Sequence, residues 1–256
     1  MALFNKVLAQ IGIGAATVDA KLFKAQLTAG EKVEGIVEVY GGNTDQKIDC
    51  IYLRLYTTYV REVDDKKVKE NFVLNNFKIN DPFTIQPGEK KEIPFSFNLP
   101  VDTPVTMGNT RVWVTTGLDI KNAIDPRDVD YVEVLPNPII HEAINAMVDI
   151  GFRLRQVECE EAPHRLRRRL PFMQEFEFVP TTGPFYGKLD EVELTFLPDG
   201  QDRFEVFMEV DRRARGLSGL FAEALEMDES MVRFYVTDQD IPKLQQMFRD
   251  AIQRYS

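Results

Sequence analysis

The chain has 256 residues, of which 44% are hydrophobic, so it can hold one large or two ordinary domains. Its formal net charge of −10 argues against a general nucleic-acid binder, and we expect no nucleic-acid partner. Two cysteines are too few for a disulfide scaffold, and no apolar run approaches the roughly 18 residues of a membrane span.

The N-terminal segment, residues 1–16, predicts a short helix. It carries a single positive charge and its apolar run is interrupted, so we do not interpret it as a signal peptide and expect a cytoplasmic protein. Its apolar residues share one helical face: Leu3, Phe4, Val7, Leu8 and Ile11. This face either docks on the rest of the protein or contacts a membrane or partner.

Two similar units of turn and strand follow. In residues 33–39 and 93–99, apolar residues occupy every second position, which predicts strands with one buried face. A turn signal precedes each strand, Gly30 in the first case and Pro87-Gly88 in the second. Pro94 lacks a backbone N–H, so we expect the second strand to lie at a sheet edge or to have an unpaired position there.

Further strands are predicted at 48–60, 72–79, 111–118 and 130–135. The first has Ile51, Leu53 and Leu55 on one face and aromatic residues on the other, and the third contains the only tryptophan, Trp113. Short strands separated by turns about every 8–12 residues indicate an all-β sandwich.

The basic residues change in kind near residue 136. Up to Pro136 the chain has 12 lysines and 4 arginines, and after it 2 lysines and 13 arginines. The sequence Leu135-Pro136-Asn137-Pro138 stops a strand and favours an extended linker. We therefore predict two domains, residues 1–136 and 137–256.

The second half predicts helices around a set of strands. A helix should begin at Pro138 and end at Gly151, and a C-terminal amphipathic helix should have Asp240 as its N-cap and Pro242 in its first turn. Predicted strands are 152–158, 173–179, 191–197, 204–210 and 231–236, with Asp199-Gly200 as a hairpin turn.

Residue types that usually support catalysis are scarce. The two histidines, His141 and His164, do not form a zinc-protease helix motif, and Ser218 lacks the spacing of a nucleophile elbow and suits a helix N-cap. Residues 12–16 mimic part of a dinucleotide fingerprint, but with helix before strand, so we read a hinge. We therefore predict no catalytic residue and no cofactor.

Asp125, Asp128 and Asp130 are the best candidates for binding a hard cation, because Ca²⁺ takes several closely spaced oxygen ligands. No glycine turn or terminal glutamate completes an EF-type loop. We expect residues 125–127 to form a turn with local charge pairing and predict no metal.

Two arginine clusters stand out in this acidic chain, and arginine suits bidentate contact with carboxylate or phosphate. The first, predicted to contact an anionic group, comprises Arg165, Arg167, Arg168 and Arg169. The alternative is internal pairing with Glu158, Glu160 and Glu161. The second opens a predicted protein-binding segment: Arg212, Arg213, Arg215, Leu217, Leu220, Phe221 and Leu225. Because the apolar members share a helical face, docking on the core is the alternative there.

Long blocks of the chain resemble a known family. Gly30–Gly35, the 87–100 unit and the Trp113 strand resemble the arrestin-like fold. The whole chain resembles the bacterial sporulation-control protein family of the stage-zero M type, in blocks at 8–15, 57–67, 82–89, 101–106, 112–123, 174–180 and 210–217.

The resemblance implies a mainly β protein with two arrestin-like β-sandwich domains in tandem and a few helices: N-terminal, inter-domain and C-terminal. It also implies a non-enzymatic cytoplasmic regulator or adaptor that acts through protein–protein contacts at the onset of sporulation. The alternative is a peripheral membrane or anionic-ligand binding module that uses Phe4, Leu8 and the arginine clusters. Partner identity and a homodimer remain open.

Overall fold

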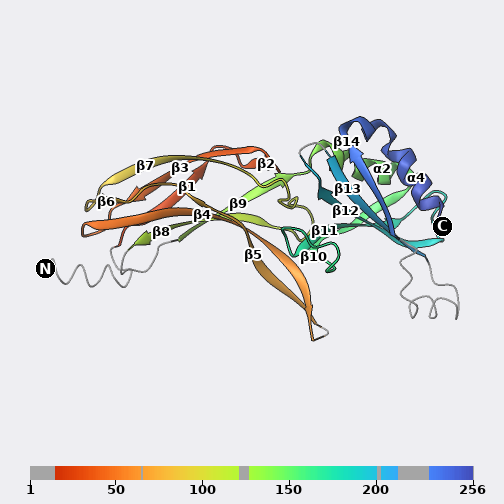
Figure 1. The fold of residues 1–256 in the computed structure, drawn as a ribbon, viewed down its shortest axis with the longest axis horizontal. Helices are drawn as coiled ribbons and strands as arrows, with labels where there is room; N and C mark the ends of the chain where they lie inside the picture. The colour runs from red at the N-terminus through yellow and green to blue at the C-terminus, as the bar shows by residue number, and fades with distance from the viewer. Residues whose placement is uncertain (1–14, 65, 121–126, 201–202, 213–230, 256) are drawn as a thin grey trace. The chain divides into compact units, whose positions relative to one another are not determined.

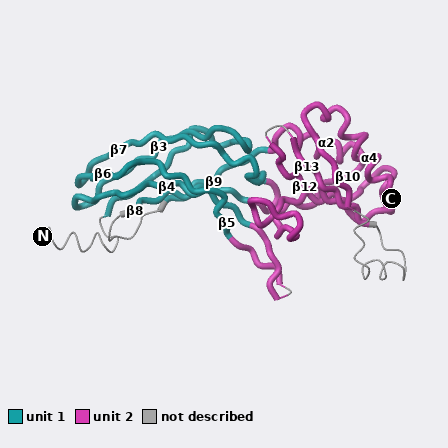
Figure 2. Tube along the Cα trace, viewed as in Figure 1, with its two compact units in different colours: residues 1–58, 71–106, 111–135 teal, residues 59–70, 107–110, 136–256 magenta. Residues whose placement is uncertain are grey.

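The computed structural model describes residues 15–64, 66–120, 127–200, 203–212 and 231–255, and its secondary structure is mainly strand (Figure 1). The predicted mainly β class is therefore confirmed. The chain divides into two compact units (Figure 2). Unit 1 comprises residues 1–58, 71–106 and 111–135, and unit 2 comprises 59–70, 107–110 and 136–256. Two stretches of the N-terminal half thus belong to unit 2.

Unit 1 contains a three-stranded antiparallel sheet in the order β1 (Thr17–Leu22), β3 (Lys32–Tyr40) and β7 (Lys90–Asn98). Glycines with positive φ, Gly30 at 87° and Gly88 at 69°, form the turns that precede β3 and β7. Pro94 lies in β7, which is an edge strand of this sheet, as predicted. The valines of β3 at alternate positions are buried, as the pattern requires.

The second set of strands in unit 1 runs in the order β4 (Gln46–Val63), β8 (Val112–Ile120), β9 (Arg127–Leu135) and β2 (Gln26–Thr28). Strands β5 (Lys66–Lys78) and β6 (Phe83–Ile85) also pair with β4. Ile51, Leu53 and Leu55 are fully buried, and the rings of Phe77 and Phe97 stack at 3.9 Å between β5 and β7. The apolar faces of the two sheets therefore form the core of unit 1.

Strands β4 and β5 form a long hairpin whose far end belongs to unit 2. The sequence predicts the start of β5 at residue 72, but the strand begins at Lys66. Its first residues are mostly charged and all exposed, so they show no buried hydrophobic alternation. Pairing with β4 maintains the extended backbone there, and Arg61 forms a cross-strand ion pair with Glu70 at 2.6 Å.

The strands of unit 2 form an antiparallel sheet in chain order: β10 (Phe152–Glu161), β11 (Phe172–Pro180), β12 (Leu189–Pro198), β13 (Arg203–Arg212) and β14 (Met231–Thr237). The predicted strands are all present. Gly200, with φ of 94°, lies in the predicted turn between β12 and β13.

Helix α2 (Pro138–Ile150) begins and ends as the sequence predicts. The Asn137 side chain accepts a hydrogen bond from the backbone N–H of Ile140 at 2.9 Å, and Pro138 occupies the first turn. Gly151 ends the helix at φ of 106°, and a Cβ there would lie 2.4 Å from the carbonyl oxygen of Thr182. Only glycine fits this conformation and this close approach without strain.

The C-terminal helix begins differently from the prediction. A 3₁₀ turn, η2 (Asp238–Lys243), precedes α4 (Leu244–Gln253), and Thr237 rather than Asp240 is the N-cap residue. Asp240 lies three residues further on, and its carboxylate accepts from the Thr237 N–H at 2.9 Å. Both α2 and α4 pack in unit 2, where Phe248 of α4 contacts Phe234 of β14 at 5.9 Å between ring centroids. Helices, rather than a second sheet of described strands, thus lie on one face of this sheet (Figure 1).

The expected N-terminal helix and the expected cap at Ser218 lie outside the described residues, apart from the final two positions of the 1–16 segment. Within the described ranges, no helix has both the length and the apolar character needed to cross a bilayer.

Candidate functional site

The first predicted arginine cluster lies between β10 and β11 and is engaged within unit 2. Arg167 pairs with Glu161, one of the predicted internal partners, and its Nε donates to the carbonyl of Ala162 at 3.1 Å. Arg168 pairs with Glu205 and donates to the carbonyl of Pro198 at 2.8 Å. Arg165 and Arg169 also have partners in the chain. Contact of this cluster with an external anion remains a prediction.

The second predicted segment is outside the described residues: Arg213, Arg215, Leu217, Leu220, Phe221 and Leu225. Arg212 ends β13, and its side chain is likewise not described. The protein-binding role of this segment therefore stays a prediction.

A cluster of glutamates covers the face of the unit 2 sheet that points away from α4; we call it the acidic face. Its members alternate with buried apolar residues along four strands: Glu158, Glu160, Glu175, Glu177, Glu191, Glu193, Glu205 and Glu209. Basic partners neutralise part of it. Lys67 pairs with Glu160 at 2.9 Å, Arg155 with Glu177 and Glu191, and both Arg168 and Arg233 with Glu205.

Two carboxyl groups of the acidic face hold their protons unusually strongly. Burial, followed by repulsion from Glu193, raises the pKa of Glu175 to about 8. Burial, followed by repulsion from Glu209, raises the pKa of Glu193 to about 7. Across the described residues, no group of acidic, histidine or cysteine side chains could hold a metal ion.

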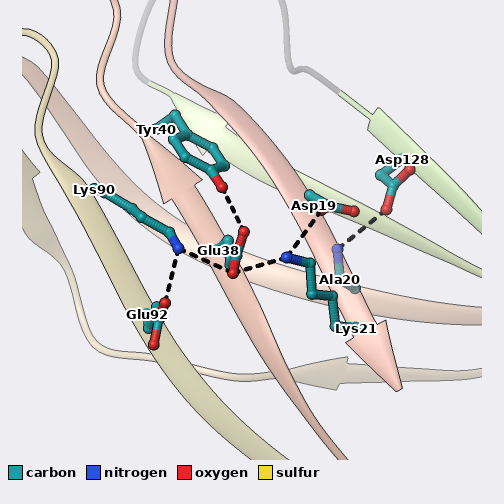
Figure 3. A network of polar contacts seen from close by, with 8 residues as sticks. All are labelled: Asp19, Ala20, Lys21, Glu38, Tyr40, Lys90, Glu92 and Asp128. Carbon is teal, nitrogen blue, oxygen red and sulfur yellow. Dashed lines mark hydrogen bonds and ion pairs between the residues drawn. The ribbon is translucent and has the colours of Figure 1, made fainter. Parts of the chain in front are cut away.

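An ionic network centred on the buried Glu38 crosses the three-stranded sheet of unit 1 (Figure 3). Glu38 of β3 is only 6% exposed, although the alternating pattern places it on the polar face. Its carboxylate accepts from Lys21 at 2.8 Å, from Lys90 at 3.1 Å and from the Tyr40 hydroxyl. These contacts, with Lys21 first, lower the pKa of Glu38 to about 2. The network binds β1, β3 and β7 together.

Two of the candidate cation ligands, Asp128 and Asp130, lie in β9. Asp125 and most of the expected turn at 125–127 lie outside the described residues. Asp128 accepts from the backbone N–H of Ala20 at 3.1 Å, which joins β9 to β1 (Figure 3). Burial, followed by the charge of Asp128, raises the pKa of Asp130 to about 7.

Both histidines are exposed. His141, on the first turn of α2, has Nδ1 3.0 Å from Glu142, and His164 lies in the connection between β10 and β11. Their surroundings are those of ordinary surface side chains.

A row of aromatic side chains crosses three adjacent strands of unit 1 on the face opposite to the core. The registers align Tyr56 of β4 with Trp113 of β8, and Trp113 with Tyr131 of β9. The ring centroids of Tyr56 and Trp113 are 5.5 Å apart with planes within 7°, and those of Trp113 and Tyr131 are 6.3 Å apart. Tyr131 is 71% exposed.

The row widens toward Tyr52 and Arg54 on β4. The Arg54 guanidinium lies 4.2 Å from the centroid of the Tyr52 ring. A Cβ at Gly117 would lie 2.3 Å from Cζ of Tyr52, so the absence of a side chain there lets the ring rest against β8. We call this set the aromatic face: Tyr52, Arg54, Tyr56, Trp113, Val129 and Tyr131. The sequence showed aromatic residues opposite Ile51, Leu53 and Leu55, but only the strand registers place them beside Trp113 and Tyr131.

These features define a mainly β protein of two units whose described surface offers an aromatic face and an acidic face. The family model described as "SpoOM protein" matches residues 4–214. The sporulation-control protein Spo0M of Bacillus subtilis (strain 168) is 43% identical over 259 residues, which cover 100% of both chains. The crystal structure of Spo0M from Bacillus subtilis superposes with a TM-score of 0.85 at 39% identity, covering 95% of this chain and 100% of the other. The chain therefore belongs to the Spo0M family.

Proposed function

We propose that the chain is a non-catalytic regulator of sporulation that works in the cytoplasm through contacts with other proteins. The observation that carries the proposal is the relationship to a sporulation-control protein along the entire length of both chains. A relationship of that extent supports a shared role, because both units are included.

The aromatic face supports action through protein contacts. Tyr131 and Val129 of β9 are 71% and 51% exposed. Exposed apolar side chains in contiguous groups usually mark interaction sites. The exposed positions of both histidines and the pairing of Glu38 within a strand network support a role without catalysis.

Replacement of the Spo0M coding sequence in Bacillus subtilis by this chain tests the sporulation part. We expect the spore titre to lie nearer to that of the parent than to that of a strain lacking Spo0M. A titre equal to that of the deletion, despite accumulation of folded protein, would contradict the proposal.

Site-specific photo-crosslinking in the same strain tests the contact part. A photoreactive residue at position 131, in the aromatic face, should give a discrete adduct with another protein at the onset of sporulation. The same residue at Tyr186, which is 66% exposed in unit 2, is the matched control. Adducts that are identical at both positions would indicate collisions rather than a site.

A membrane or anionic-ligand module is not favoured by the geometry of the arginine cluster. Arg167 and Arg168 already pair with Glu161 and Glu205. Flotation of the purified chain with anionic liposomes separates this alternative from the proposed function.

A further inference from the structure

The polar groups of the aromatic face lack hydrogen-bond partners in the part of the chain that the structure describes. This holds for the hydroxyls of Tyr52, Tyr56 and Tyr131 and for the indole N–H of Trp113. Arg54 contacts the Tyr52 ring but pairs with no described carboxylate. Indole and guanidinium groups can only donate. The aromatic face therefore offers two groups that only donate, and three tyrosine hydroxyls that can donate or accept, beside exposed ring surfaces.

A ligand that matches this face must supply acceptors and apolar surface. A proline-rich segment does both, because proline has no N–H and the polyproline II conformation leaves its carbonyls free. Aromatic-lined grooves bind such segments in several unrelated domains, and the preformed conformation limits the entropy lost on binding. The tyrosine hydroxyls of the face both donate and accept, so a saccharide is the competing ligand and is included in the test.

The spacing of the rings agrees with this ligand. Successive ring centroids are 5.5 and 6.3 Å apart across β4, β8 and β9. Neighbouring strands are about 4.8 Å apart, so the row extends about 10 Å. One turn of polyproline II contains three residues and rises about 9 Å. Residues i and i+3 of a peptide that crosses the strands can therefore contact the two ends of the row.

Arg54 favours an acidic residue in the ligand. It is the guanidinium of the aromatic face and is half-buried beside Tyr52, so an incoming carboxylate would pair with it where water is partly excluded. A basic residue at that position would be repelled.

We propose that the aromatic face binds a proline-rich segment of a partner protein in the polyproline II conformation, with an acidic residue of that segment paired to Arg54. This inference rests on the proposed adaptor function and specifies the chemistry of its partner.

The tryptophan of the aromatic face makes a direct test possible, because Trp113 is the only tryptophan in the chain. The purified full-length chain is titrated with a synthetic peptide of one glutamate followed by six prolines, and Trp113 emission is recorded. We expect a saturable change. The peptide with lysine in place of glutamate should bind at least about fivefold more weakly, and a glycine–serine peptide with the same glutamate should not saturate the signal.

Variants locate the binding. Tyr131→Ala should weaken the glutamate–proline peptide about tenfold, as expected for an aromatic anchor, and Arg54→Gln should abolish the preference for glutamate over lysine. Tyr186→Ala is the matched control, because Tyr186 is comparably exposed but lies in unit 2, and it should bind as the parent chain does. Thermal unfolding confirms that each variant is folded.

Three results would overturn the inference: no saturable change with the proline peptide, equal binding of the glycine–serine peptide, or unchanged binding by Tyr131→Ala. Saturation by cellohexaose in the absence of peptide binding would also overturn it. These failures are distinguishable from failure of the proposed function, which the spore titre and the crosslinked adducts decide without the peptide.

Discussion

Replacement of Glu175 by glutamine should stabilise unit 2 at high pH and leave it unchanged at low pH. Burial, with repulsion from Glu193 next, raises the pKa of Glu175 to about 8. The folded chain therefore binds this proton more tightly than the unfolded chain. The contribution of the protonated Glu175 carboxyl to the free energy of unfolding is complete below about pH 4.5 and is lost as the pH rises through about 8. Glutamine is neutral throughout and imitates the protonated form.

The size of the effect follows from the difference between the two pKa values. The gap between about 8 in the folded chain and the ordinary 4.5 corresponds to about 5 kcal/mol at about 1.36 kcal/mol per pKa unit. Glu175 is half-buried, so water screens part of the ionised form, and we expect about 2 kcal/mol at pH 9. With a urea dependence of about 2 kcal/mol per molar, the midpoint should rise by about 1 M.

Urea unfolding at pH 5 and pH 9, followed by circular dichroism at 222 nm, measures this change. The signal reports unit 2, because α2 and α4 both belong to it. The control is Asp149→Asn, an exposed position on α2, which should shift the midpoint equally at both pH values. A midpoint difference for Glu175→Gln that is the same at pH 5 and pH 9 would refute the assigned electrostatics.

Three further perturbations test the fold around the proposed surfaces. Gly151→Ala should destabilise unit 2 by about 2–4 kcal/mol, because φ is 106° and the new Cβ would lie 2.4 Å from the Thr182 carbonyl oxygen. Gly187→Ala is the control, because Gly187 has φ of 75° but open space around a new Cβ, and it should cost about 1 kcal/mol. If urea unfolding shows equal losses of stability for the two variants, the contact with the Thr182 carbonyl oxygen is not the cause. Glu38→Gln should destabilise unit 1 at pH 7. The hydrogen bonds from Lys21, Tyr40 and Lys90 lower the pKa of Glu38 to about 2, so the ionised carboxylate stabilises the fold at pH 7. This stabilisation is lost as the pH falls through about 2. Trp113 fluorescence during unfolding measures it, and an unchanged transition at pH 7 would exclude the network. Asp130→Asn should gain stability over the parent as the pH rises from 5 to 8. Burial and then the charge of Asp128 raise the pKa of Asp130 to about 7, so the parent loses stability as this carboxyl ionises and the asparagine variant does not. A stability difference between variant and parent that is independent of pH in the same assay would rule this out.

Features with a local physical cause could be predicted from the sequence. Strands with one buried face, such as β3, follow from hydrophobic alternation. Pro87-Gly88 predicts the turn before β7 from backbone sterics alone. The ends of α2 follow from Asn137, Pro138 and Gly151 for the same reason. The start of β5 does not, because its polar first residues are extended through pairing with β4 rather than through their own pattern.

The candidate surfaces depend on contacts between distant residues. No local pattern shows that Glu38 is buried, because its burial comes from Lys21 and Lys90 on neighbouring strands. The acidic face likewise arises when strands that each carry alternating glutamates align in one sheet.

The order of residues alone therefore determined the class of fold, the presence of most strands and helices, and the family to which the chain belongs. Tertiary structure decided which side chains meet: 57 positions separate Tyr56 from Trp113, yet their rings stack at 5.5 Å. The physical reason is that strand register, set by the packing of the whole sheet, brings residues together at any separation along the chain.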